Sequence, residues 1–162
     1  MNLILKDQHP ISRTDVSVNA ARVIGRLRKK GHDAYLVGGA VRDLLIGIQP
    51  KDFDVSPDAS PEQIKSIFPS SKIIGRRFKL AHVRFGKEVI EVSTFRGSHE
   101  TIESQNINSE QSSQYSQHGV LVRDNIFGTL EEDILRRDIT INALYYDTQG
   151  ESIVDHTQGF RD

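Results

Sequence analysis

The 162-residue chain contains no cysteine, no tryptophan and a single methionine. The absence of cysteine excludes disulfide bonds and thiolate metal sites, and it fits a reducing compartment. No apolar run approaches the roughly 18 residues that a membrane-spanning helix needs. The N-terminus also lacks the charged, apolar and small-residue regions of a secretory signal. We therefore expect a cytoplasmic, soluble protein with no membrane partner.

An excess of charge of one sign is also missing, because 21 basic residues face 22 acidic residues and give a formal net charge of −1. Proteins that bind nucleic acid usually show a basic surplus, so any RNA-binding surface here must be local or lie outside this chain. The length is sufficient for one compact domain with its own core.

The most informative segment follows an apolar run at 35–37 and contains Gly38, Gly39 and Arg42. Glycine has no Cβ, so a Gly-Gly pair after a strand lets the backbone turn tightly and brings bare amides close to a ligand. One helical turn later, Arg42 offers a fork of donors for phosphate oxygens. By itself, however, a Gly-Gly pair is also typical of an ordinary strand-to-helix turn.

A second motif, Asp52-Phe53-Asp54-Val55, follows closely. Side chains at i and i+2 share one face of a strand, so Asp52 and Asp54 point the same way while Phe53 and Val55 point into the core. Two adjacent carboxylates repel unless a cation lies between them, and hard oxygen ligands favour Mg²⁺. A solvated strand edge is the alternative. The order of the two motifs favours a site for a nucleotide and a metal ion.

Glu91 is a third candidate ligand. It lies on the face of its strand opposite Ile90 and Val92. A charge within a strand core is costly, so Glu91 lies either at a sheet edge or beside a cation. Because Asp52 and Asp54 are present, we expect a neighbouring strand to supply a third carboxylate.

Hydrophobic periodicity and capping residues predict the other elements. The predicted helices run from Asp15 to about Lys30, from Ala40 to Ile46, from Ser60 to about Phe68, from Thr129 to Arg136 and, as a short helix, from Asp138. The predicted strands are Ala34 to Val37, Asp52 to Ser56, Lys72 to Gly75, Leu80 to Phe85, Lys87 to Thr94, Tyr145 to Tyr146 and Ser152 to Val154.

Two segments are expected to contain little regular structure. Residues 1–14 form a mixed leader, and residues 15–162 form one domain. Within that domain, Ser, Gln and Asn make up 12 of the 21 residues at 98–118. Such a polar stretch has few apolar anchors, so it predicts a mobile loop.

Three segments in a fixed order resemble the head domain of class II nucleotidyltransferases: Gly38 to Asp43, Asp52 to Asp54, and Arg136 to Leu144. This group contains the CCA-adding tRNA nucleotidyltransferases and the bacterial poly(A) polymerases. The segments 73–82 and 91–97 are similar to the poly(A) polymerase I branch. The resemblance implies an α/β, polymerase-β-like fold with a mixed, mostly antiparallel sheet of about five strands and helices packed on it.

The activity that the resemblance implies is template-independent transfer of AMP from ATP to an RNA 3′ hydroxyl, with release of pyrophosphate. It implies the following roles: two Mg²⁺ ions held by Asp52, Asp54 and Glu91, a triphosphate bound by Gly38, Gly39, Arg42 and Arg137, and Asp138 among the catalytic acids. Asp138 can alternatively be the N-cap of the following helix.

Full-length members of the group continue into neck and body domains, which have no counterpart in this sequence. The chain is therefore expected to choose ATP poorly and to bind RNA weakly. Two alternatives stay open: a CCA-adding enzyme, and an inactive head that serves as an interaction module. Arg76 and Arg77 are either phosphate or RNA contacts or a solvated pair.

Overall fold

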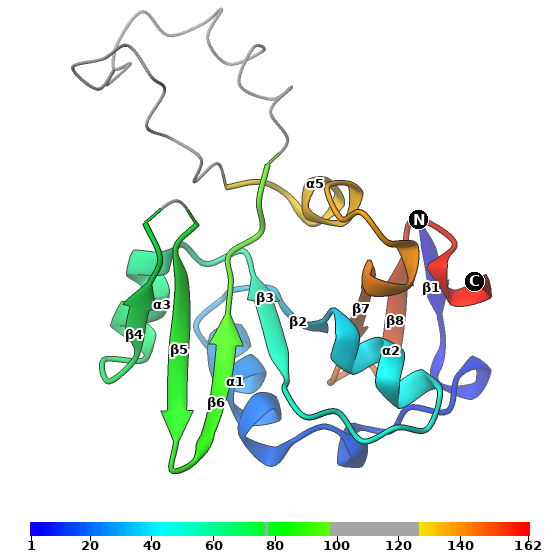
Figure 1. Ribbon diagram of the computed structural model, residues 1–162, viewed down its shortest axis with the longest axis horizontal. Helices are drawn as coiled ribbons and strands as arrows, with labels where there is room; N and C mark the ends of the chain where they lie inside the picture. The colour runs from blue at the N-terminus through cyan, green and yellow to red at the C-terminus, as the bar shows by residue number, and fades with distance from the viewer. Residues whose placement is uncertain (77, 98–126) are drawn as a thin grey trace, which may run out of the picture.

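The computed structural model describes residues 1–76, 78–97 and 127–162, so Arg77 and the predicted loop at 98–118 lie outside the described residues. One sheet of eight strands forms the frame, in the order β1-β8-β7-β2-β3-β6-β5-β4 (Figure 1). The strands are β1 (Asn2–Ile4), β2 (Ala34–Val37), β3 (Asp54–Pro57), β4 (Lys72–Ile74), β5 (Leu80–Phe85), β6 (Glu88–Val92), β7 (Leu144–Asp147) and β8 (Ser152–Asp155). The helices are α1 (Val18–Lys29), α2 (Gly39–Leu45), α3 (Pro61–Ile67) and α5 (Leu130–Leu135).

The sheet is mixed and mostly antiparallel, as predicted. The exception is the pair β3 and β6, which is parallel. The expected number of about five strands was too small. Short strands extend the sheet at both edges, with β1 paired to β8 and β4 paired to β5. No helix in the described ranges is both long and apolar enough to cross a membrane.

Helix α1 forms because its apolar residues recur on one face, and Ala20, Val23, Ile24 and Leu27 are all buried. Its N-cap is Ser17, whose side chain accepts a hydrogen bond from the Ala20 amide. The prediction that Asp15 caps this helix was wrong, because Asp15 belongs to a preceding 3₁₀ turn. A serine hydroxyl two residues later satisfies the free amide instead.

The capping boxes predicted for the next helices are confirmed. Ser60 with Gln63 begins α3, and Thr129 with Glu132 begins α5. The short helix predicted from Asp138 is instead a 3₁₀ turn at Thr140–Asn142. Its N-cap is Ile139, which makes no side-chain capping bond, so the N-cap interpretation of Asp138 was wrong.

The first fourteen residues are more ordered than the composition suggested. Besides forming β1, this segment is held at the turn between β7 and β8. The Glu151 carboxylate accepts hydrogen bonds from the Arg13 amide (3.0 Å) and from the Lys6 ammonium, and His9 Nε2 lies 2.7 Å from the Glu151 carbonyl oxygen. These long-range contacts order a leader that has little local propensity of its own.

The two faces of the sheet carry different cores. Leu36 and Tyr146 belong to the main core, which also contains the buried residues of α1 and α3. Their sequence neighbours Val37 and Tyr145 point to the opposite face and pack with Ile134 of α5. The alternation of strand side chains therefore directs β2 and β7 into both layers.

Phenylalanine substitutions at Tyr145 and Tyr146 are expected to have opposite effects on stability. Within the described part of the chain, the buried Tyr146 hydroxyl finds no hydrogen-bond partner, whereas the Tyr145 hydroxyl donates to Asp133 and accepts from Arg137. Tyr146→Phe should leave the free energy of unfolding unchanged or raise it, and Tyr145→Phe should lower it by about 1–3 kcal/mol. Urea denaturation measures both, and a larger loss from Tyr146→Phe would contradict the assignment.

Candidate active site

The glycine turn lies where β2 passes into α2. Gly38 has φ +73° and ψ −145°, a conformation that side chains disfavour strongly. A Cβ at Gly38 would lie 3.9 Å from Asp54 Oδ2 and 4.0 Å from Arg137 Nη1. The turn thus brings backbone next to an acid of the second motif and to an arginine that lies about a hundred residues later in the sequence.

Asp54 and Glu91 lie side by side on the two parallel strands, where they are direct Cα partners. Glu91 therefore lies on a strand next to β3, as expected, while its role as a third ligand stays a prediction. Phe53 and Val55 are buried, as predicted, at 4% and 0% exposure. Partial burial, followed by the charges of Glu91 and then Asp52, raises the pKa of Asp54 to about 6.

Asp52 lies just before β3 and is exposed. Its negative charge acts on Asp54 together with that of Glu91, while Arg137 acts in the opposite direction. Within residues 1–76, 78–97 and 127–162, no group of three acidic, histidine or cysteine side chains is arranged so that it could hold a metal ion. The charges of Glu91 and Asp52 both disfavour ionisation of Asp54, and the assignment of the three carboxylates as Mg²⁺ ligands stays a prediction.

Arg137 is held beside this site by Asp133, a residue of α5 with no exposed surface. Asp133 Oδ2 lies 3.3 Å from Arg137 Nη2 and also accepts a hydrogen bond from the Tyr145 hydroxyl. Arg137 Nε donates to the same hydroxyl at 2.8 Å, and its guanidinium lies 5.2 Å from the Tyr145 ring centroid. Burial and the Asp133 charge raise the pKa of Tyr145, so the phenol stays protonated.

The second oxygen of Asp133 connects two further elements. Oδ1 accepts hydrogen bonds from the Arg96 amide at 2.9 Å and from Arg136 Nε at 2.8 Å. One buried carboxylate therefore fixes α5, the chain after β6 and the Arg137 side chain together. Neither Asp133 nor Tyr145 is among the site residues predicted from the sequence. The i+3 and i+4 spacing from Asp133 to Arg136 and Arg137 was the available signal.

Arg42 is partly exposed on α2 and is already engaged. Its Nε and Nη2 lie 3.1 Å from Asp43 Oδ1, and its Nη1 donates to Asn142 Oδ1 at 3.1 Å. A guanidinium has five N–H donors, so Arg42 still has N–H groups for a phosphate oxygen. Gly39 leaves room for the Arg42 guanidinium, because a Cβ at position 39 would lie only 3.0 Å from Arg42 Nη2.

No described contact connects the remaining predicted residues, Asp138 and Arg76, with the acidic pair. Asp138 is exposed, and its charge is not among those that shift the pKa of Asp54. Its role as a catalytic acid stays a prediction. Arg76 is exposed after β4.

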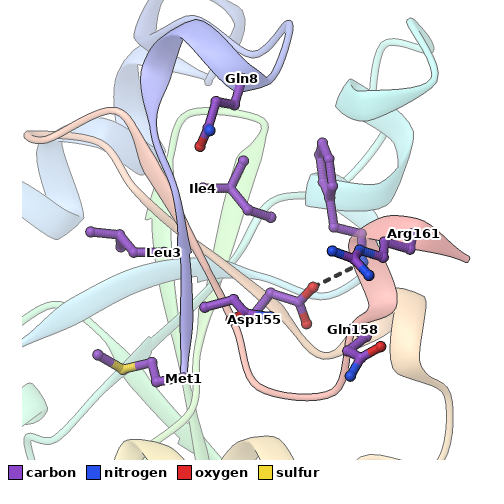
Figure 2. A pocket seen from close by; sticks show the side chains of 9 residues that line it. Met1, Leu3, Ile4, Gln8, Asp155, Gln158 and Arg161 are labelled. Carbon is purple, nitrogen blue, oxygen red and sulfur yellow. Dashed lines mark hydrogen bonds between the residues drawn. The ribbon is translucent and has the colours of Figure 1, made fainter.

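A pocket of about 430 Å³ lies elsewhere, between β1, β8 and the turn near the C-terminus (Figure 2). In the sheet, β7 and β2 separate it from β3. The one buried acid in its lining is Asp155, whose carboxylate accepts hydrogen bonds from the amides of Thr157, Gly159 and Phe160. Asp155 thus caps the turn beside this pocket.

Comparison with known proteins identifies similar chains. Poly(A) polymerase I of Salmonella typhimurium (strain LT2) is 53% identical over 162 residues, which are 100% of this chain and 34% of that protein. A CC-adding tRNA nucleotidyltransferase of Halalkalibacterium halodurans is 36% identical over 91% of this chain and 31% of its own length. The chain spans about a third of the length of the curated relatives that it matches.

A solved structure shares the fold. The crystal structure of the Bacillus stearothermophilus CCA-adding enzyme in complex with CTP superimposes with a TM-score of 0.66 at 33% identity, covering 88% of this chain and 30% of that one. A family model described as the poly A polymerase head domain matches residues 34–162. Since this match includes the glycine turn, both acidic strands and Arg137, the chain belongs to the poly A polymerase head domain family.

Proposed function

We propose that this head domain catalyses template-independent transfer of AMP from ATP to RNA 3′ ends, with release of pyrophosphate. The observation that supports it most directly is the pairing of Asp54 with Glu91 beside the Gly38 turn, in a chain 53% identical to a poly(A) polymerase I. The Glu91 charge helps to raise the pKa of Asp54, and two adjacent carboxylates form a donor set suited to a divalent cation.

In this proposal Asp52, Asp54 and Glu91 hold Mg²⁺. When bound, Mg²⁺ would lower the pKa of the attacking RNA hydroxyl and neutralise charge on pyrophosphate. The protein provides position and charge, and no covalent intermediate is needed.

The triphosphate would lie on the α2 side of the acids. The Gly38 backbone leaves room for close approach, while Arg137 and Arg42 offer guanidinium donors to phosphate oxygens. Arg137 can do so in one orientation because Asp133 and Tyr145 occupy its other N–H groups. Asp138 is proposed as a further acid of the site, without a contact to support it.

The function can be tested on the 162-residue chain itself. We expect calorimetry to detect ATP binding that requires Mg²⁺ and disappears with EDTA, and we expect AMP incorporation into an oligo(A) primer. An inability to bind any nucleoside triphosphate in the presence of Mg²⁺ would overturn the proposal and favour an interaction module.

A second candidate is CCA addition, because the CC-adding relative and the CTP-bound structure are also similar. The two activities differ in their acceptor and nucleotide. Incorporation of CMP into tRNA lacking its terminal CCA, in excess over AMP into oligo(A), would support the second candidate against the first.

A further inference from the structure

One half of the sheet has a face that no described helix covers. In β5 and β6 the buried side chains alternate with more exposed ones, and Ala81, Val83, Ile90 and Val92 are at most 3% exposed. These four belong to the core that α1 and α3 cover. Figure 1 views β4, β5 and β6 from the face that α1 and α3 do not cover, and these two helices lie behind the strands.

On this open face, one row of side chains leads to the acidic pair. The strand register places Lys72 opposite His82, His82 opposite Glu91, and Glu91 opposite Asp54. Directly opposite residues have neighbouring Cβ atoms on the same face. Arg84, two residues after His82, shares this face, and both Lys72 and Arg84 are exposed. A basic margin therefore borders the carboxylates on the side of β4 and β5.

An exposed aromatic ring, that of Phe78, lies just before β5 in the chain. The Phe78 side chain is 44% exposed, and the Arg96 guanidinium lies 4.3 Å from its ring centroid. The Arg96 amide donates to Asp133 Oδ1, and Asp133 also accepts a hydrogen bond from Arg137, so Arg96 is tied to the residue that holds Arg137 at the site. An aromatic ring with a cation is the combination on which single-stranded nucleic acids stack their bases.

The in-line geometry of phosphoryl transfer gives the two sides of the acidic pair different roles. In phosphoryl transfer the attacking and leaving oxygens are roughly in line, on opposite sides of the reacting phosphorus. If the triphosphate lies against Gly38 and Arg137, the RNA hydroxyl must approach from the other side of Asp54. The element on that side is β6, followed in the sheet by β5 and β4.

We infer that the open face of β4, β5 and β6 is the binding surface for the 3′ end of the acceptor RNA. Phe78 and Arg96 stack a base near that end, and Lys72 and Arg84 contact phosphates. This inference rests on the proposed function, and it explains how a chain of net charge −1 can bind RNA. Lys72 and Arg84 give this face a local positive charge.

The test uses the 162-residue chain and a fluorescent oligo(A) RNA, with binding measured by anisotropy. Phe78→Leu is expected to weaken binding about tenfold, because it removes one stacked base, whereas Phe78→Tyr keeps parental affinity. Replacing both Lys72 and Arg84 by Ala should make the negative slope of log K against log salt shallower by about 1.4, the value for two single-strand phosphate contacts.

Two control variants carry the same kinds of change on the opposite side. Lys29→Ala removes an exposed cation of α1, and Ile73→Ala removes an apolar side chain from the β4 position that pairs with core residue Ala81. Both are expected to bind oligo(A) as the parent does. All five variants should keep the parental affinity for ATP with Mg²⁺, since none alters the acids or the glycine turn.

Parental oligo(A) affinity in Phe78→Leu and in the double variant would overturn the inference. So would an equal loss in the Lys29→Ala control, or a parent chain that binds no oligo(A). In each case, intact binding of ATP with Mg²⁺ would leave the proposed function standing. Loss of that binding in the parent would remove the proposed function itself, so the two failures are distinguishable.

Discussion

Asp54→Asn is expected to abolish Mg²⁺-dependent ATP binding while leaving the fold intact. The substitution removes the charge of the most central carboxylate with little change in volume, and a divalent cation between Asp52 and Glu91 would then lose its shared ligand. We expect at least a hundredfold loss of affinity, on the order of 3 kcal/mol. Calorimetry with Mg²⁺ and ATP measures it.

The matched control is Asp7→Asn, which neutralises an exposed carboxylate in a 3₁₀ turn near the N-terminus. This variant should bind as the parent does. Equal affinity of Asp54→Asn and the parent would remove Asp54 from the metal site.

The same substitution should also change how stability depends on pH when Mg²⁺ is absent. The pKa of Asp54 is raised from 3.8 to about 6 in the folded chain, so the unfolded chain loses this proton first. The stability that protonated Asp54 gives to the folded chain is fully present below pH 3.8 and is lost as the pH rises through 6. Asp54→Asn should therefore raise the free energy of unfolding in EDTA at pH 7.5, by about 1–2 kcal/mol after allowance for partial exposure.

Asp133→Asn should have the largest effect on stability, and it should weaken nucleotide binding as well. The carboxylate is fully buried between Arg136 and Arg137, and removing one partner of a buried ion pair costs about 3–5 kcal/mol. Arg137 also loses the group that orients it toward Gly38. We expect a fall in affinity for ATP with Mg²⁺ of about tenfold or more. Urea denaturation and calorimetry measure the two effects.

Glu131→Gln provides the control, because Glu131 is an exposed acid of the same helix. It should change neither quantity by a comparable amount. An Asp133→Asn chain that folds and binds nucleotide as tightly as the parent would show that Arg137 needs no support from α5.

Local features of the sequence were sufficient where the determinants are short-range. The strand Ala34–Val37 was predicted with its observed bounds, because polar residues precede this short apolar run and Gly38 ends it. The helices beginning after Ser60 and Thr129 were predicted from their capping boxes. The two-residue period of a strand predicted that Asp54 and its buried neighbours point to opposite faces of the sheet.

Features that depend on distant partners were not predictable in this way. Strand β1 exists because it pairs with β8, and a three-residue segment has no local signal for such a partner. Asp133 resembles an ordinary acid in the first turn of a helix, where it would favour the helix dipole. Its burial depends on Tyr145 and on Arg137, which come from later in the chain.

The parallel pairing of β3 with β6 has a consequence for the order in which the parts of the candidate site form. Asp54 and Glu91 meet only after α3, β4 and β5 have emerged and the chain has closed a long loop around them. Contacts of high sequence separation form slowly during folding. A growing polypeptide on the ribosome therefore contains its glycine turn before its pair of acids, which is complete only when β6 docks beside β3.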